Sequence, residues 1–396
     1  MGKKEMEKAF VYVSSWNNLG GAPGLGLYAA DTETGELTFL EMINTEDSLN
    51  AMLIDEKKDL LCVCCEEELN RKNLMVSGRI LTWRLDGETG RAEKIGETMT
   101  GCPNPAWLSM SPDGRYLFVA HHSRAISLIH HERGSDGKII SRNIWAEAAV
   151  QVWRRDQDGI PEKLVDSIDL ADHDHGVDAH PHCTVFSPSG RVIAVADKGT
   201  GMLSLYTFDE GTEQLVLRSR KLTDSPGGCP RYVIFHPQRP WLFVNHEASI
   251  DGTCMVSAFE YTEEGMMRKM GAVNALLFPA ERKPGPRLEQ QGFVMSPDGG
   301  TIYTLINSAN RIGIISVNPE NGEMRVTQNI PVDGTHPRAM AISPDGRMLI
   351  TGSLVTGELC VFRIRENGEL ERTEARLKQR GASTILFRNA KRRVYL

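Results

Sequence analysis

The sequence of 396 residues has no run of the roughly 20 consecutive apolar residues that a membrane-spanning helix needs. It also lacks an excess of positive charge, because 45 Lys and Arg stand against 52 Asp and Glu, for a net charge of -7. This balance argues against general binding to nucleic acids or acidic membranes. The charged first eight residues are not followed by the apolar core of a signal peptide. We therefore expect a cytoplasmic protein that binds neither nucleic acid nor membrane.

Cysteine is scarce, and its spacing does not match a zinc site. The sequence has eight cysteines, and Cys62, Cys64 and Cys65 lie within a single apolar, strand-like run. We interpret the cysteines as reduced, buried thiols.

Several catalytic signatures are also missing. The sequence contains no G-x-S-x-G motif, no Walker A loop and no dinucleotide-binding fingerprint. The glycine-rich stretch 20–26 is not followed by a predicted helix, so we interpret it as a loop. The commonest serine hydrolase, phosphate-loop and Rossmann mechanisms are therefore not expected.

What the sequence does contain is a pair of recurring turn signatures. The first is an apolar run that ends in a Pro or Gly turn, at 111–114, 187–190, 236–238, 296–299 and 343–346. Proline presets the turn dihedral and Asp or Gly completes the reversal. The second is a hairpin glycine after a strand with alternating apolar residues. It occurs at Gly35, Gly90, Gly159, Gly211, Gly265, Gly322 and Gly368, at intervals of 46 to 69 residues.

Seven units of about fifty residues with four strands each predict an all-β, seven-bladed β-propeller with antiparallel blades. The chain begins and ends within a unit, so we expect the N- and C-terminal strands to share one blade and close the ring. The longest interval predicts an insertion at about 130–145 in the third blade. We interpret residues 1–396 as a single domain.

The two strand ends opposite these turns predict a polar ring at one end of the propeller axis. Counting back five positions from each turn between first and second strands gives Asn50, Ala106, His182, Arg231, Gln291, Arg338 and Ser383. The ends of the second strands add His121, His122, Asp197, Lys198, Asn245, His246, Glu247 and Asn307.

Two arginines, a histidine and a carboxylate at such a ring could bind an anionic small molecule and move a proton. The alternative is that they only line a channel and bond to backbone and water. The occurrence of both Arg231 and Arg338 directly after proline, at corresponding positions, favours a ligand site.

The loop 172–182 is dense in Asp and His. A divalent metal could bind near Asp174, His175 and His180, although the spacing matches no known metal motif and a solvated loop is the alternative. Because side chains alternate in an extended strand, we expect only one of His180 and His182 to face the pocket. His121 and His122 are interpreted as loop residues near the insertion.

These residues resemble those of the seven-bladed-propeller lactonases, a family that includes propeller-type 6-phosphogluconolactonases and fungal 3-carboxy-cis,cis-muconate lactonizing enzymes. The resemblance covers about residues 10–390. It rests on His-Pro-His at 180–182, Asp-Lys-Gly at 197–199, the segment 228–237, Asn-His-Glu at 245–247 and His-Pro-Arg at 336–338. It implies that His182, Arg231 and Glu247 serve in acid–base chemistry and substrate binding.

One position departs from the family. Its members usually carry an Asn-Arg pair at the end of the second strand of the sixth blade, where this chain has Ile306 and Asn307. The nearest arginine is Arg311. The departure points to a changed substrate or a lost activity.

We therefore predict a lactone hydrolase that acts on an anionic sugar-acid lactone and requires no cofactor. His182 or Glu247 would activate water, and Arg231 would stabilise the developing oxyanion. Arg338, Asp197, Asn245, Gln291 and Asn307 would bind the substrate. The alternatives are a muconate-type cycloisomerase and a non-catalytic propeller scaffold. The protein would be a monomer or a small homo-oligomer.

Overall fold

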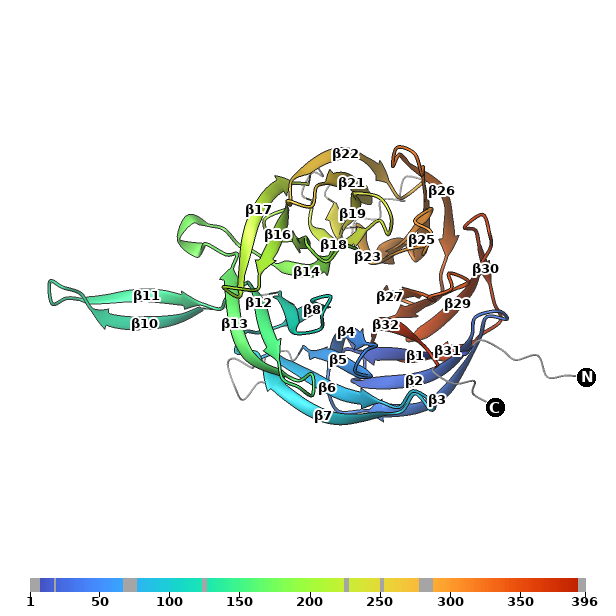
Figure 1. Ribbon diagram of the computed structural model, residues 1–396, viewed down its shortest axis with the longest axis horizontal. Coiled ribbons are helices and arrows are strands. Elements are labelled where there is room, and N and C mark those ends of the chain that lie inside the picture. Colours follow the sequence, from blue (N-terminus) through green and yellow to red (C-terminus); the bar gives the residue numbers. More distant parts are fainter. Residues whose placement is uncertain are drawn as a thin grey trace, which may run out of the picture.

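The computed structural model describes residues 8–17, 19–66, 77–122, 127–223, 228–249, 253–277 and 288–390. These residues form seven blades of antiparallel strands arranged around a central axis (Figure 1). The predicted all-β propeller is confirmed. Each innermost strand lies against the next around a closed ring.

The first blade contains both ends of the chain. Its strands are β1 (Lys8–Ser15), β2 (Gly24–Asp31), β3 (Glu36–Asn44) and β32 (Ala382–Asn389), in the sheet order β32-β1-β2-β3. The C-terminal strand is innermost and pairs antiparallel with β1. The predicted closure of the ring by a shared blade is therefore confirmed, and no sheet edge is left open between the first and last described blades.

The other six blades follow the chain from the inside outwards. The second blade contains β4 (Leu49–Asp55), β5 (Leu60–Cys65), β6 (Arg79–Leu85) and β7 (Ala92–Met99), and the third contains β8 (Pro105–Met110), β9 (Tyr116–His121), β12 (Ala149–Arg155) and β13 (Pro161–Asp169). The fourth contains β14 (Pro181–Phe186), β15 (Ile193–Asp197), β16 (Met202–Asp209) and β17 (Gln214–Leu222), and the fifth contains β18 (Pro230–Phe235), β19 (Trp241–His246), β21 (Met255–Tyr261) and β22 (Met267–Asn274). The sixth contains β23 (Leu288–Met295), β24 (Thr301–Ile306), β25 (Arg311–Val317) and β26 (Met324–Pro331), and the seventh contains β27 (Pro337–Ile342), β28 (Met348–Ser353), β29 (Glu358–Ile364) and β30 (Leu370–Arg372). Two short strands, β20 (Ala248–Ser249) and β31 (Leu377–Lys378), add to the sixth and seventh blades.

The predicted turn residues explain where the chain reverses. In the second blade, the Asp86 carboxylate accepts hydrogen bonds from the N–H groups of Glu88 and Thr89, at 2.8 and 2.9 Å. Gly90 follows with a φ of +74°, a conformation that glycine adopts without strain. At this turn of the fourth blade the residue with the left-handed backbone conformation is Glu213, with a φ of 57°. The predicted turn glycine of this blade, Gly211, does not have a positive φ.

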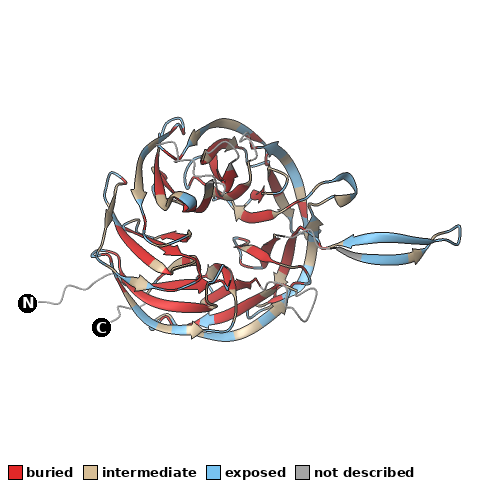
Figure 2. Cartoon of the chain, turned by 180° about the vertical axis from the view of Figure 1, so that it is seen from behind, coloured by how far each residue is buried: buried red, intermediate tan, exposed pale blue. Residues whose placement is uncertain are grey.

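The core lies between neighbouring blades. Inner strands are buried and outermost strands are largely exposed (Figure 2). Phe243 of the fifth blade and Ile302 of the sixth, for example, are fully buried in the same cluster. Burial of one such side chain contributes roughly 2 kcal/mol. Packing between blades therefore stabilises the ring on which the axial residues are mounted.

A β-bulge recurs at the start of the innermost strand. In all seven described blades the register to the next strand shifts there. The residues left out of the pairing by these shifts include all seven positions that were counted back from the turns, namely Asn50, Ala106, His182, Arg231, Gln291, Arg338 and Ser383. Because a bulge re-aims the side chain of the extra residue, it accounts for how these positions can face the axis.

The predicted insertion is a separate β-hairpin, β10 (Ser127–Arg133) and β11 (Ile139–Trp145). It projects outwards from the third blade (Figure 1). The hairpin begins at Ser127, three residues before the predicted start of the insertion at about 130. The helical segments in the described ranges are two three-residue 3₁₀ turns, η1 (His173–His175) and η2 (Asn307–Ala309), and neither could span a membrane.

Candidate active site at the axis

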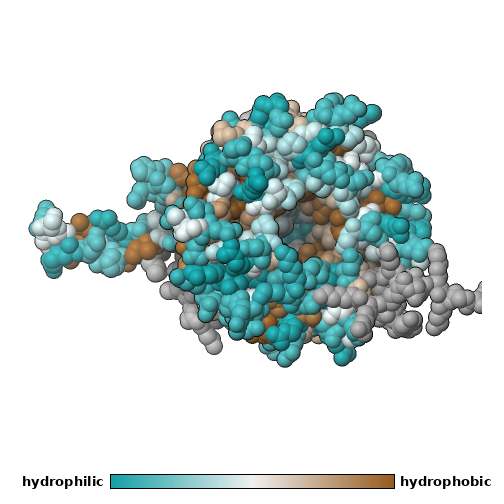
Figure 3. Space-filling model, viewed as in Figure 1, coloured by the Kyte–Doolittle hydropathy of each residue, from teal (hydrophilic) through white to brown (hydrophobic). Residues whose placement is uncertain are grey.

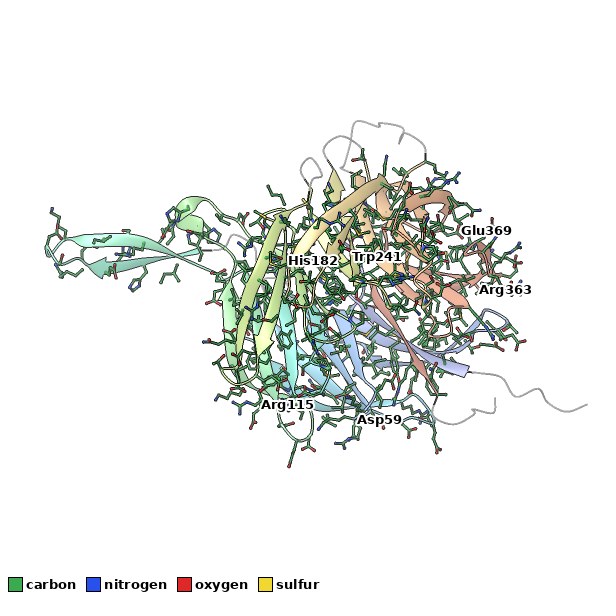
Figure 4. All side chains as sticks on the ribbon, turned by 45° about the horizontal axis from the view of Figure 1, so that its top comes forward. Asp59, Arg115, His182, Trp241, Arg363 and Glu369 are labelled. Atoms are coloured by element: carbon green, nitrogen blue, oxygen red, sulfur yellow. The ribbon has the colours of Figure 1, made fainter. Side chains whose placement is uncertain are left out.

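A second set of axial positions follows directly after the second strand of each blade. Its members are Trp16, Glu66, His122, Lys198, Glu247, Asn307 and Leu354. In six of the seven described blades the N–H of this residue donates to the carbonyl two residues before the bulge residue, as Glu247 does to Cys229 at 2.7 Å. This hydrogen bond holds the two axial positions of a blade side by side. Figure 4 places His182 inside the ring, whereas Asp59 and Arg115, from the turns of the opposite face, project at its edge.

Glu247 joins the cations of two blades. Its Oε2 accepts a hydrogen bond from Arg231 Nη1, and its Oε1 accepts one from Lys198 Nζ at 2.9 Å. Arg231 is 2% exposed, and the Lys198 side chain is 24% exposed. Burial would raise the pKa of Glu247, but Arg231 and Lys198 outweigh it and lower that pKa to about 2. Glu247 is therefore ionised at neutral pH, and both its oxygens are engaged.

Three histidine rings gather beside this ion pair. The His122 ring stacks on His180 with centroids 4.7 Å apart and meets the edge of His182 at 5.5 Å. His182 also contacts the Tyr232 ring, at 5.3 Å. Burial, together with the nearby Arg231, lowers the pKa of His182 well below its ordinary value, so the imidazole is neutral. Its Nδ1 is buried and has no hydrogen-bond partner in the described structure.

Two sequence predictions about these histidines were wrong. His180 and His182 both contact His122, because the bulge at 182 breaks the strict alternation of an extended strand. His121 and His122 are not simple loop residues. His121 is fully buried, and its Nε2 lies 3.1 Å from Gln151 Oε1. His122 belongs to the group of three histidine rings described above.

Arg338 is a buried cation whose side chain makes no hydrogen bond or ion pair with any residue that the structure describes. Its guanidinium carbon lies 4.7 Å from the ring centroid of Trp16. Burial and the neighbouring Arg231 lower the pKa of Arg338, but an arginine remains charged at neutral pH. A buried charge without a partner is costly, so this position suits an anionic ligand.

The sixth blade contributes amide groups. Asn307 Nδ2 donates to Glu289 Oε2 at 3.1 Å and lies 3.3 Å from His336 Nε2. Because the carboxylate requires the amide NH₂ on that side, Asn307 Oδ1 points elsewhere, and it is buried without a partner. Gln291 Oε1 is in the same condition. Arg311 in β25 is the nearest arginine in sequence. Its guanidinium donates to the Asn329 carbonyl in β26.

Two predicted substrate-binding residues are engaged with the protein itself. Asn245 accepts from the N–H of Tyr232 and donates to the Gln291 carbonyl, which ties the fifth blade to the sixth. Asp197 accepts from the N–H of His180 at 2.7 Å and from the Thr200 hydroxyl at 2.6 Å. Both side chains hold site segments in place.

The acidic loop offers no assembled metal site. Among the residues with described positions, no three His, Cys, Asp or Glu side chains gather as metal ligands. His175 Nδ1 pairs with Asp172 at 2.7 Å, and both are exposed. His180 lies instead in the imidazole cluster.

Sequence reasoning placed Lys198 at the end of a second strand without a role, interpreted His122 as a loop residue, and did not identify Trp16. The signal was available in the position after each second strand, which is Glu247 in the fifth blade and Lys198 in the fourth. Applied to every blade, that position identifies all three.

Comparisons with known proteins agree with the fold. The family described as lactonase, seven-bladed β-propeller, matches residues 10–387. The chain belongs to this family. Among propeller lactonases and their relatives, it is 23% identical over 370 residues to the 6-phosphogluconolactonase of Formosa agariphila, covering 92% of this chain and 95% of that protein. It is 22% identical to the 6-phosphogluconolactonase of Bacillus subtilis, covering 92% and 94%.

A solved structure of the periplasmic gluconolactonase of Pseudomonas aeruginosa has the same fold as this propeller lactonase. The TM-score is 0.79 at 22% identity, and the match covers 97% of this chain and 99% of the other. At this identity the likeness concerns the fold alone.

Proposed function

We propose that this protein hydrolyses a sugar-acid lactone that carries an anionic group. The observation that carries the proposal is a concentration of unpartnered buried polar atoms at the axis. The described residues contain thirteen such side-chain atoms. Six of them belong to the bulge residues or to the residues that follow the second strands, on Trp16, His182, Arg231, Gln291, Asn307 and Arg338. Because folded proteins leave few buried polar groups unpaired, this cluster fits a polar ligand. The family and its relatives named 6-phosphogluconolactonase support a lactone as that ligand.

His182 is the better of the two candidate bases. Both carboxylate oxygens of Glu247 already accept from cations, and its low pKa makes it a weak base. His182 is neutral with a free buried nitrogen. A bound anion would offset the field of Arg231 and Arg338, which raises the basicity of His182 when substrate is present.

In the proposed reaction His182 takes a proton from water as the water oxygen attacks the lactone carbonyl carbon. Negative charge develops on the carbonyl oxygen, and Arg231 and Lys198 are the nearby donors that stabilise it. The ring C–O bond then breaks, and the leaving oxygen receives the proton from His182. Glu247 acts as a positioning residue, because it holds both cations.

The sixth blade favours a lactone over a muconate. Asn307 Oδ1 and Gln291 Oε1 are acceptors without donors. The hydroxyl groups of a sugar lactone can supply such donors, whereas an unsaturated dicarboxylate offers only more acceptors. The cycloisomerase alternative is therefore the weaker one.

The test is hydrolysis of 6-phosphogluconolactone and of δ-gluconolactone by the purified protein, measured above the spontaneous rate. We expect turnover with wild type and a fall in kcat of at least 100-fold for His182→Ala. Asp136→Ala, in the exposed hairpin tip, serves as the matched control. Absence of turnover for every lactone tried, or equal rates for wild type and His182→Ala, would refute the proposal.

We also propose a cytoplasmic location. No disulfide is formed among the described cysteines, and seven of the eight are buried, which fits a reducing compartment. A periplasmic location, like that of the Pseudomonas gluconolactonase, is the alternative, and fractionation of cells would distinguish the two.

A further inference from the structure

The hairpin β10–β11 is a ribbon of two strands, and no third described strand pairs with it. Two-stranded ribbons are marginally stable in water on their own. Each strand has seven residues, so the tip lies about 23 Å from the base at about 3.3 Å per residue. The tip therefore cannot fold back onto the base of its own hairpin.

The ribbon exposes isoleucine on both faces. Ile129 and Ile139 lie on one face and are 68% and 60% exposed, and Ile140 and Ile144 lie on the other at 39% and 55%. These are four of the fourteen exposed large apolar side chains among the described residues. Figure 3 shows apolar residues on this hairpin in an otherwise largely hydrophilic surface. Exposed apolar side chains gathered in this way mark an interaction surface.

A pocket of about 650 Å³ lies at the base of the same hairpin. Trp145 of the hairpin, which stacks on His173 at 4.3 Å, lines this pocket together with Leu215 and Leu217 of β17. The lining also contains three carboxylates, of Asp169, Asp172 and Asp174, and one cation, Arg220. The pocket thus combines apolar surface with an excess of negative charge.

The hairpin and the pocket wall differ in charge. Residues 127–145 contain three Lys or Arg, two Asp or Glu and two His, whereas residues 169–178 contain four Asp, two His and no Lys or Arg. In a chain with a net charge of -7, the hairpin is a locally positive element. Its apolar and basic character complements the pocket at the base.

We propose that the hairpin is an arm by which two copies of this chain associate, the tip of each arm filling the pocket at the base of the other. Reciprocal exchange of this kind makes a closed two-fold dimer, because the same two surfaces meet twice. Ile139 and Ile140 bury against Leu217 and Trp145 of the second copy, and Lys138 lies against the acidic wall.

The experiment is sedimentation velocity of the full chain from 1 to 100 μM, at low salt and at 0.5 M NaCl. We expect a dimer that weakens with salt, because part of the attraction is between charges. Ile139→Asp/Ile140→Asp on the tip and Leu217→Glu in the pocket should each weaken the dimer at least tenfold, because each removes apolar contact and adds negative charge. Met266→Asp, which replaces another exposed apolar side chain, in the fifth blade, should leave it unchanged.

A mixture separates arm exchange from other modes of association. The arm variant keeps its pocket and the pocket variant keeps its arm, so mixing them should restore a heterodimer through one intact contact. A wild type that is monomeric at 100 μM overturns the proposal, and so does a dimer that ignores the arm variant. A dimer sensitive to the arm variant but not to Leu217→Glu would mean that arms pair with each other, which also overturns it. Circular dichroism of each variant shows whether the ring remains folded.

Discussion

The guanidinium of Arg338 lies over the indole of Trp16, 4.7 Å from the ring centroid. Arg338 comes from the seventh blade and Trp16 from the first, so the contact joins two blades that are neighbours in the ring. It holds a buried cation in place without neutralising it. That combination suits a site that receives an anion from solution.

Replacement of Arg338 should weaken the binding of an anionic lactone more than that of a neutral one. For Arg338→Ala we expect a fall in kcat/KM for 6-phosphogluconolactone of about 100-fold, since charge-assisted hydrogen bonds are worth about 2–3 kcal/mol. Arg338→Lys should recover only part of it, because a lysine lacks the planar group that stacks on Trp16. Steady-state kinetics on phosphorylated and unphosphorylated lactones measure this. Equal losses on both would show that Arg338 acts only through the fold.

Glu247→Gln should destabilise the protein strongly. The substitution leaves Arg231, which is 2% exposed, without its counter-charge, and loss of one partner of a buried pair costs about 3 kcal/mol. Urea denaturation gives the free energy of unfolding. Glu210→Gln is the control, because its pair with Arg115 is more than half exposed on both sides and such pairs contribute below about 1 kcal/mol. Similar midpoints for the two variants would contradict the prediction.

Stability should fall as the pH drops from 6.5 towards 4. Burial lowers the pKa of His121 and His246 to about 4 and that of His122 to about 3. Between these values and 6.5 the unfolded chain binds protons that the folded chain does not, so acidification favours unfolding. At pH 5.5 each histidine costs on the order of 1 kcal/mol. Thermal melts from pH 7.5 to 5 measure this.

Two variants check the origin of that pH dependence. His246→Asn removes one buried imidazole and should flatten the decline. His131→Gln removes an exposed imidazole of the hairpin and should not alter the decline. A Tm that stays constant across this range in wild type would rule the explanation out.

Asn307 should determine how the enzyme discriminates among lactones. Asn307→Leu removes the unpartnered Oδ1, so kcat/KM for δ-gluconolactone should fall about tenfold, as expected for loss of one hydrogen bond to a substrate hydroxyl. The rate with δ-valerolactone, which has no hydroxyl groups, should change little. Competition assays with both lactones test this, and a parallel loss on both would argue for a packing defect.

The number of blades could be predicted from the sequence because turn chemistry is local. A glycine such as Gly90 after an Asx turn, or Asp113 after Ser111 and Pro112, encodes a reversal within four residues. Seven such reversals at regular spacing leave few alternatives. Counting back from the turns also identified every bulge residue, because the strand length is nearly constant.

The roles of individual axial residues could not be predicted in the same way. Asn245 and Asp197 have the same polar character as Asn307 and Glu247 in sequence, yet the first two bond to backbone and the others face the axis. The donors belong to the same blade but are distant in sequence, at Tyr232 for Asn245 and at His180 for Asp197. A pattern read over a few neighbouring residues does not contain them.

The order of apolar runs and turn residues by itself determined a closed seven-bladed ring, since each of those signals acts over a few neighbouring residues. Only the tertiary structure decided that Glu247 binds the cations of two blades, and that no carboxylate in the described part of the chain pairs with Arg338. The physical reason is that charge pairing and burial depend on distances through space, and these are set when blades far apart in the chain pack around one axis.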